Sequence, residues 1–202
     1  MAYSIKEIFY SLQGEGINTG RPAVFVRFSG CNLSCPFCDT DFTGTDGPGG
    51  GIYGSAPGVI SAMRACLPPS QRDEASRFAV LTGGEPAPQV DDGLIRELHD
   101  DNWEIAIETN GTIPIPPGID WVTVSPKAGP GCVVANGNEL KLLYPQKGID
   151  PVCFEKLDFT HFIIQPLEEA GTSENLRDAI AYCLAHPRWR LGIQLHKFIG
   201  IK

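Results

Sequence analysis

Short apolar runs alternate with longer amphipathic stretches along most of the chain. The runs are rich in β-branched and aromatic residues and are bounded by Gly, Pro, Asn or Asp, a pattern that is typical of strands. The longer stretches repeat their apolar positions at helical spacing. Strands are predicted over residues 5–9, 23–28, 77–81, 104–107, 121–124, 139–143, 162–165 and 191–195. Helices are predicted over residues 57–67, 90–98 and 176–184.

Strands that alternate with helices indicate an α/β fold with a mostly parallel sheet. The intervals 112–119 and 128–138 are too short, or too rich in Gly and Pro, for a full helix, so we expect fewer helices than strands. No internal repeat, coiled coil or interdomain linker interrupts the 202 residues. The chain is therefore expected to form a single domain over residues 1–202.

The formal net charge of -8 argues against a nucleic-acid-binding protein, which would need a basic surface. No apolar run approaches the roughly 20 residues of a transmembrane helix, and the first residues lack the basic and apolar regions of a secretory signal. We therefore expect a cytoplasmic protein with neither a membrane nor a nucleic-acid partner. Positive charge is still available near turns and strand ends, at Arg21, Arg27, Lys127 and Lys141.

Three of the 7 cysteines lie close together, at Cys31, Cys35 and Cys38, with the spacing C-x3-C-x2-C. Iron–sulfur clusters usually take four cysteine ligands, so three thiolates would leave one iron open to a substrate or cofactor. A structural zinc site is the alternative, and its fourth ligand would come from another cysteine or a histidine. A disulfide framework fits poorly, because the cysteine count is odd and the chain is not small.

Polar or glycine-rich segments follow five of the predicted strands. They are the cysteine loop and residues 82–86 (TGGEP), 108–111 (ETNG), 125–127 (SPK) and 165–168 (QPLE). Each is weak evidence alone, since most such segments are only turns. In parallel α/β sheets, however, ligands bind beyond the carboxyl ends of the strands. The shared position of the five segments therefore predicts one binding site at this edge of the sheet.

The cysteine loop, with Phe37 just before its third cysteine, and residues 83–86 (GGEP) resemble the radical S-adenosylmethionine superfamily. The resemblance implies a partial (β/α) barrel with a mostly parallel sheet. It also implies a 4Fe-4S cluster whose open iron is chelated by the amino and carboxylate groups of S-adenosylmethionine. One electron from the cluster would then break the bond between the sulfonium and the 5′ carbon.

Further segments are similar to the 7-carboxy-7-deazaguanine synthase family and cover nearly the whole chain. They are residues 7–16 (EIFYSLQGEG), 21–23 (RPA), 27–33 (RFSGCNL), 38–40 (CDT), 108–111, 125–127, 139–141 (ELK), 165–166 (QP) and 194–197 (QLHK). The resemblance implies conversion of 6-carboxy-5,6,7,8-tetrahydropterin to 7-carboxy-7-deazaguanine with loss of ammonia, in the biosynthesis of queuosine and other 7-deazapurines. A 5′-deoxyadenosyl radical would remove a hydrogen atom at C6, the ring would contract, and S-adenosylmethionine would be re-formed.

The resemblance also implies roles for individual residues. Cys31, Cys35 and Cys38 would ligate the cluster, and Thr40 would bind Mg²⁺ together with the substrate carboxylate. S-adenosylmethionine would contact Phe37, Cys38, Asp39, Gly84, Ser125, Pro126, Lys127, Gln165, Pro166, Leu167 and Glu168. The pterin would contact Leu12, Gln13, Gly14, Arg27, Thr82 and the main chain of Lys202, including a terminal carboxylate there. Arg27 has a rationale of its own, because a guanidinium can pair bidentately with a carboxylate.

The partners implied by the resemblance are a second copy of the chain, in a homodimer, and a flavodoxin-like electron donor. Two features depart from the family pattern. Glu168 stands where an aspartate is expected, and the segment 44–54 is short and glycine-rich.

Two other functions stay open on the sequence. A small activase that makes a glycyl radical on a partner protein would share the cluster but would not need a carboxylate clamp. A zinc-binding interaction module would share only the cysteine spacing. The site residues have plainer readings too: Arg27 could point to solvent, Glu15 could be a surface acid, and His196 a structural residue. The remaining cysteines are expected to be small buried side chains, at Cys66, Cys132, Cys153 and Cys183.

Overall fold

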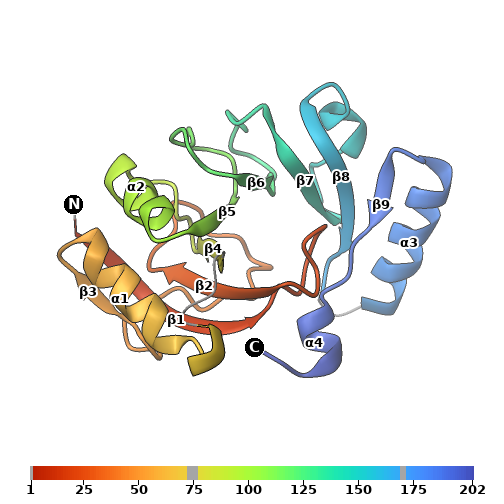
Figure 1. Cartoon of the computed structure of the whole chain (residues 1–202). Helices are drawn as coiled ribbons and strands as arrows, with labels where there is room; N and C mark the ends of the chain where they lie inside the picture. Colours follow the sequence, from red (N-terminus) through yellow and green to blue (C-terminus); the bar gives the residue numbers. More distant parts are fainter. Residues whose placement is uncertain (1, 72–76, 169–171) are drawn as a thin grey trace.

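The computed structural model describes residues 2–71, 77–168 and 172–202, and the nine strands among them belong to one sheet (Figure 1). The strands are β1 (Tyr3–Leu12), β2 (Pro22–Phe28), β3 (Gly51–Tyr53), β4 (Arg77–Gly83), β5 (Trp103–Thr109), β6 (Trp121–Val124), β7 (Asn136–Tyr144), β8 (Asp158–Pro166) and β9 (Trp189–Leu191). Their order across the sheet is β3-β1-β2-β4-β5-β6-β7-β8-β9. β1 pairs antiparallel with β2 and β3, and every pair from β2–β4 onward is parallel.

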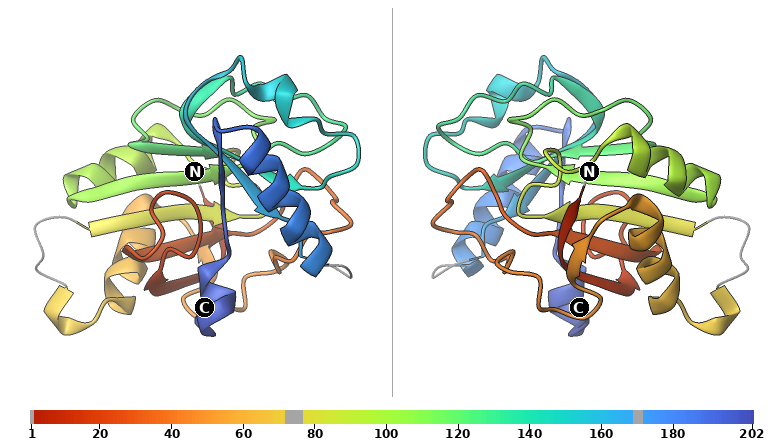
Figure 2. Two further views of the ribbon diagram at one scale, coloured as in Figure 1. Left: turned by 90° about the vertical axis from the view of Figure 1, so that its right-hand side faces the viewer. Right: turned by 90° about the vertical axis from the view of Figure 1, so that its left-hand side faces the viewer.

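Few helices cover this sheet. Those in the described ranges are α1 (Ala56–Cys66), η1 (Pro69–Gln71), α2 (Asp92–Asp100), η2 (Pro151–Phe154), α3 (Thr172–Ala185) and α4 (Leu195–Ile199). α1 packs on β1 and on α2, α2 packs on β5, and α3 packs on β8 and β9. Figures 1 and 2 show that the sheet curves into an arch with α1, α2 and α3 on its outer side. The predicted partial (β/α) barrel with fewer helices than strands is therefore confirmed.

Apolar side chains cover both faces of the central strands. Val24 and Val26 of β2 lie in the core beneath α1 and α2. The alternate residue Phe25 packs on the inner face of the arch with Val80 and Ala106 from the next two strands. A strand that is buried on both faces shows a continuous apolar run instead of a polar alternation. This explains why the parallel strands were recognisable from their sequence.

The start of α2 follows from an aspartate in the capping position. The carboxylate of Asp91 accepts a hydrogen bond from the backbone N–H of Leu94 at 2.9 Å, which pairs one of the free amides of the first turn. Leu94, Ile95 and Leu98 are all buried against the sheet. The predicted helical stripe is confirmed here.

The prediction of a last strand over 191–195 is wrong. Pairing with β8 ends at Leu191, and the backbone N–H of Leu195 instead donates to the carbonyl of Gly14 at 2.8 Å. The chain leaves the sheet edge to reach the loop after β1, and α4 begins at Leu195. The short β3 and α4 were not predicted, because three and five residues give too little periodicity to detect.

The predicted apolar stripe of α3 faces the sheet only in part. Ala179 is fully buried, and Tyr182 and Cys183 pack against the core beside it. Leu176 and Ile180 are 39% exposed, and Leu184 is 80% exposed. An apolar stripe this wide cannot lie against the sheet over its whole width, so the row at positions 176, 180 and 184 faces outward. Cys153, also expected to be buried, is exposed on η2.

Among the described residues, no helix has the length and apolar content needed to span a membrane.

Leu94→Ala should lower the free energy of unfolding by about 2–5 kcal/mol. The Leu94 side chain of α2 is fully buried against the sheet, and truncating it leaves a cavity. Leu184→Ala is the matched control, since that side chain is largely exposed; its effect should stay within about 0.5 kcal/mol. Chemical denaturation of both variants, followed by circular dichroism, measures the difference. Equal losses would mean that α2 does not pack as described.

Candidate active site

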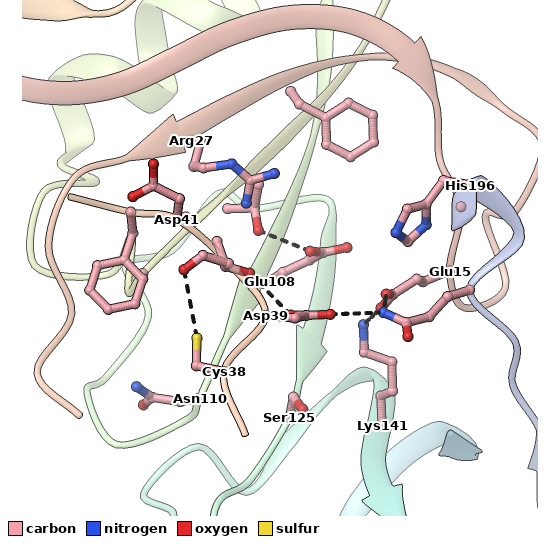
Figure 3. A pocket seen from close by; sticks show the side chains of 18 of the residues that line it. Glu15, Arg27, Cys38, Asp39, Asp41, Glu108, Asn110, Ser125, Lys141 and His196 are labelled. Atoms are coloured by element: carbon pink, nitrogen blue, oxygen red, sulfur yellow. Dashed lines mark hydrogen bonds and ion pairs between the residues drawn. The ribbon is translucent and has the colours of Figure 1, made fainter. Parts of the chain in front are cut away.

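A pocket of about 430 Å³ lies at the carboxyl ends of the parallel strands (Figure 3). All five strand-end segments that were predicted to form a site contribute side chains to it. Two further segments contribute to its wall: residues 12–15, at and just after the end of β1, and residues 194–202, at the other end of the chain. Side chains within β1, β2, β6 and β7 complete the lining.

The predicted site residues line this pocket, with the exceptions of Pro126 and Pro166. Those that line it are Leu12, Gln13, Gly14, Arg27, Cys31, Cys35, Phe37, Cys38, Asp39, Thr40, Thr82, Gly84, Ser125, Lys127, Gln165, Leu167, Glu168 and Lys202. The two prolines each stand beside residues that do line the pocket. They therefore fix the course of the main chain next to the site.

The three cysteines of the loop after β2 are unpaired and reach the same pocket. Burial raises the pKa of the Cys35 thiol, the nearby Lys127 ammonium opposes that rise, and Cys38 and Cys31 add to it. The described residues include no group of three His, Cys, Asp or Glu side chains placed to share one metal ion. A cluster binds each thiolate through a separate iron, so its ligands need not converge on one point. Three thiols in one loop, with the partly buried Lys127 ammonium nearby, fit such a group.

The other four cysteines lie outside the pocket. Cys66 ends α1, Cys153 is on η2, Cys183 is on α3, and Cys132 packs beside Val134 in the segment before β7. None of them shares the pocket lining with the loop cysteines, and the histidine in that lining is His196.

Two glycines let the turn after β4 approach the cysteine loop closely. A Cβ on Gly84 would collide with the carbonyl oxygen of Gly30 and would lie 2.8 Å from the Cβ of Cys31. Gly83 has φ +135, and a Cβ there would meet the backbone of Phe28. A hydrogen bond stabilises this contact: the N–H of Glu85 donates to the Gly30 carbonyl at 3.0 Å. The pair is therefore needed for packing, in addition to any contact with a cofactor.

The buried Glu85 ties that turn to the end of β5. Its carboxylate accepts hydrogen bonds from Thr109 Oγ1 at 2.7 Å and from the N–H of Asn110 at 2.8 Å. Asn110 in turn donates from Nδ2 to Asn32 in the cysteine loop at 2.9 Å. Glu85 and Asn110 therefore act as braces that hold the loop against two neighbouring strand ends.

Polar groups from β1, β4 and β5 meet on the opposite side of the pocket. Thr82 Oγ1 and Gln13 Nε2 each donate to a different oxygen of Glu108, both at 3.0 Å. Arg27 extends into the same part of the pocket (Figure 3) and its Nε donates to Glu7 at 2.9 Å. Its side chain is only 20% exposed, so the plain reading of a solvent-facing arginine is wrong.

A buried lysine sits among carboxylates beside this group. Lys141 forms an ion pair with Glu15, whose other oxygen accepts from Gln194 Nε2 at 2.8 Å. Burial alone would lower the pKa of Lys141, but the charges of Glu15, Glu108 and Glu139 outweigh it and raise that pKa. Burial raises the pKa of Glu139. Burial also acts to raise the pKa of Glu15, but the charge and hydrogen bond of Lys141, together with the hydrogen bond from Gln194, outweigh it and lower that pKa. Glu15 is therefore not a surface acid.

A second lysine is held near the cysteines. Lys127 Nζ donates to the carbonyl of Ser125 at 2.6 Å and to its hydroxyl at 2.7 Å. Burial, together with the nearby charge of Lys141, lowers the pKa of Lys127 to about 8.

The segment after β9 forms one wall of the pocket and packs against the loop at Gly14. A Cβ on Gly14 would lie 2.7 Å from the Cβ of His196, so only glycine permits this approach. Lys197 donates to Asp39 in the cysteine loop at 2.6 Å and also pairs with Glu168 after β8. The carboxylate of Glu168, the residue that departs from the expected aspartate, is thus engaged by Lys197.

Several pocket residues were missed or held only weakly on the sequence. Glu7, Lys141, Gln194 and Lys197 were given no specific role in the site, because their positions depend on pairing between distant segments. The sequence did carry signals for them. All four lie in segments that resemble the family, and Glu7 and Lys141 are charged residues inside otherwise strand-like runs.

A curved, partly open α/β barrel with three free cysteines in one loop at its strand ends defines a protein of the radical S-adenosylmethionine class. No model of a protein family matches the chain. It is 52% identical to the 7-carboxy-7-deazaguanine synthase of Nitratidesulfovibrio vulgaris and 49% identical to that of Bordetella pertussis, with 100% of both chains covered in each case. The chain belongs to the 7-carboxy-7-deazaguanine synthase family.

A solved structure supports the same assignment. The crystal structure of QueE from Escherichia coli matches with a TM-score of 0.73 and 28% sequence identity, covering 97% of this chain and 95% of that chain. Membership in this family implies the cofactors of radical S-adenosylmethionine enzymes, and the free thiols of the cysteine loop suit them.

Gly84→Ala should destabilise the protein by about 1–3 kcal/mol and lower its bound iron and sulfide, because the added Cβ displaces the cysteine loop. Gly131→Ala is the control, since a Cβ there meets open space. Iron and sulfide analysis of anaerobically reconstituted protein, with thermal unfolding in parallel, tests both effects. Full cluster content in Gly84→Ala would contradict the close approach described above.

Lys141→Met should destabilise the fold by about 3–5 kcal/mol at neutral pH, because it leaves buried carboxylates without their cation. The folded pKa of Glu15 lies below its ordinary 4.5, so the stability from this pair is present above that pH and is lost as the pH falls through the folded pKa. The gap between wild type and variant should therefore shrink below pH 4.5. Urea unfolding across this range measures it, with Lys147→Met, an exposed lysine, expected to match wild type.

Proposed function

We propose that this enzyme converts 6-carboxy-5,6,7,8-tetrahydropterin to 7-carboxy-7-deazaguanine with loss of ammonia, in queuosine and related 7-deazapurine biosynthesis. Sequence identity of 52% and 49%, over the full length of two enzymes named for that product, supports the reaction. The single structural observation that supports the substrate is Arg27, a partly buried guanidinium that points into the pocket from an apolar strand. A carboxylate is the ligand that such a group binds best.

The cysteine side of the pocket is proposed to hold the cofactors. Cys31, Cys35 and Cys38 would ligate a 4Fe-4S cluster, and S-adenosylmethionine would lie against the segments after β2, β4, β6 and β8. Its contacts are proposed at Phe37, Cys38, Asp39, Gly84, Ser125, Pro126, Lys127, Gln165, Pro166, Leu167 and Glu168. When bound, these groups supply the radical that removes a hydrogen atom from the substrate. Gln165 is 2% exposed and its Oε1 has no hydrogen-bond partner among the described atoms, which suits a ligand contact.

The opposite side is proposed to hold the pterin. Arg27 binds its carboxylate, Thr40 binds Mg²⁺ beside that carboxylate, and the remaining contacts come from Leu12, Gln13, Gly14, Thr82 and the main chain of Lys202. A pterin ring carries N–H donors on its pyrimidine edge, and Glu15 and Glu108 offer carboxylate acceptors there. Gln13 and Thr82 already donate to Glu108, so they fix the direction in which it faces.

The chain is also proposed to act as a single-domain cytoplasmic enzyme, in a homodimer, with a flavodoxin-like protein as its electron donor. Its nine described strands share one sheet, and its 7 cysteines are all unpaired, which suits a reducing compartment. The outward row Leu176, Ile180 and Leu184 on α3 offers apolar surface for association.

The direct test is anaerobic incubation of reconstituted protein with S-adenosylmethionine, magnesium, a reductant and the carboxypterin. Formation of 7-carboxy-7-deazaguanine is expected, and its rate should fall when magnesium is omitted. Absence of that product with intact cluster would reject the proposed reaction. Protein that carries zinc and no iron or sulfide would instead favour the interaction module.

Arg27→Ala should lower kcat/KM for the carboxypterin by about 100-fold or more, because it removes charge-assisted hydrogen bonds to the carboxylate. Reductive cleavage of S-adenosylmethionine should continue, since Arg27 is not among the residues proposed to contact the cluster or S-adenosylmethionine. Product and 5′-deoxyadenosine are quantified together by chromatography, with the exposed Arg190→Ala as control. Equal loss of both activities would point to an activase-like site without a carboxylate clamp.

A further inference from the structure

An irregularity in β1 decides which face of the sheet Glu7 occupies. Ile5 pairs with Phe28 and Glu7 pairs with Arg27, so β1 has one residue more than β2 between these two pairs. Ile5 and Phe28 lie in the core beneath the helices, whereas Glu7 and Arg27 line the pocket. Side chains alternate along a regular strand, so Glu7, two residues after Ile5, would share the face of Ile5 if β1 had no bulge. The bulge at Lys6 therefore turns Glu7 into the pocket.

The carboxylate of Glu7 is engaged by two cations. Its Oε1 accepts a hydrogen bond from Arg27 Nε at 2.9 Å, and its Oε2 pairs with the ammonium of Lys202. The side chain of Glu7 is only 11% exposed. Burial raises the pKa of Glu7, but the contacts with Lys202 and Arg27 outweigh burial and leave that pKa below its ordinary value. Glu7 is therefore ionised at neutral pH.

The contact with Glu7 uses only one edge of the Arg27 guanidinium. Arginine presents five donors in one plane, and Nη1 and Nη2 of Arg27 make no hydrogen bond to the described residues. Beside it, Phe9 stacks on Phe25 with ring centroids 5.0 Å apart, and the guanidinium carbon lies 5.9 Å from the Phe9 ring centroid. Aromatic rings on one side and Glu7 on another leave the two terminal nitrogens for a ligand in the pocket.

We propose that Glu7 is a positioning residue for substrate binding: it holds the Nε edge of Arg27 so that the two terminal nitrogens face the substrate carboxylate. This inference rests on the proposed function, in which Arg27 binds that carboxylate. Glu7 is itself negative and would repel a carboxylate, and Asp41 adds a second negative charge near Arg27, whereas the side chains of Arg27 and Lys202 are positive. Orientation and repulsion predict opposite results when Glu7 is removed, so the experiment can separate them.

The test measures equilibrium binding of two unreactive probes, 6-carboxypterin and pterin, to anaerobically reconstituted protein by fluorescence titration. Glu7→Ala should weaken binding of 6-carboxypterin by about 10- to 100-fold, because the clamp loses its orientation. Binding of pterin, which lacks the carboxylate, should not change. Glu7→Gln keeps an oxygen that can accept from Arg27 Nε, and it should recover part of the loss.

A double-mutant cycle shows whether Glu7 acts through Arg27. In an Arg27→Ala background, Glu7→Ala should cause no further loss of 6-carboxypterin binding. The control is Glu104→Ala, which removes a Glu–Arg pair outside the pocket, where Glu104 accepts from Arg21 Nη1 at 3.0 Å and Nη2 at 2.7 Å. That control should leave the binding of both probes unchanged.

Two results would overturn the inference. Unchanged or tighter binding of 6-carboxypterin by Glu7→Ala would mean that Glu7 only neutralises charge. Equal losses for both probes would mean a general structural role. Failure of the proposed function has a different signature, because wild-type protein would then show no preference for the carboxylated probe and would form no deazaguanine.

Discussion

The close backbone contact between the cysteine loop and the turn after β4 is the constraint on which this site depends. β2 and β4 are parallel neighbours, so their carboxyl ends meet at one edge, and two adjacent glycines remove the side chains that would keep those ends apart. Glu85 continues the contact to β5 through Thr109 and the N–H of Asn110. The protein's own contacts thus hold the ends of β2, β4 and β5 together. These contacts fix the position of the cysteine loop and therefore of its thiols.

The far side of the pocket is organised by charge instead of by close packing. Cations and carboxylates alternate around it: Lys141 with Glu15, Lys197 with Asp39, and Arg27 with Glu7. Two of these pairs join segments that are distant in the sequence, and the third joins the neighbouring strands β1 and β2. In a chain with a net charge of -8, the side chains that line the pocket carry equal numbers of cations and carboxylates, so the pocket is less negative than the chain as a whole.

The sequence predicted the parts of the fold that local pattern controls. The central strands carry continuous apolar runs because both of their faces are buried, and Asp91 marks the start of α2 by direct hydrogen bonding. Motifs at strand ends located the pocket, since chain direction in a parallel sheet sends them to one edge. The segment after β9 was misjudged, because its course depends on a hydrogen bond to Gly14, nearly the whole chain away. Glu7 was overlooked for a related reason: its face depends on a register shift that only pairing with β2 reveals.

The bulge in β1 has a consequence for how this strand tolerates changes in length. Side chains that build the core and side chains that face the pocket alternate along this strand, and the extra residue at Lys6 shifts the alternation by one position. Deleting Lys6 would place Glu7 directly after Ile5, and simple alternation would then keep Ile5 and Ile8 toward the helices and Glu7 toward the pocket. Deleting a residue elsewhere in β1 would instead exchange the two faces for part of the strand. The bulge is therefore a place where β1 can lose a residue without exchanging core and pocket.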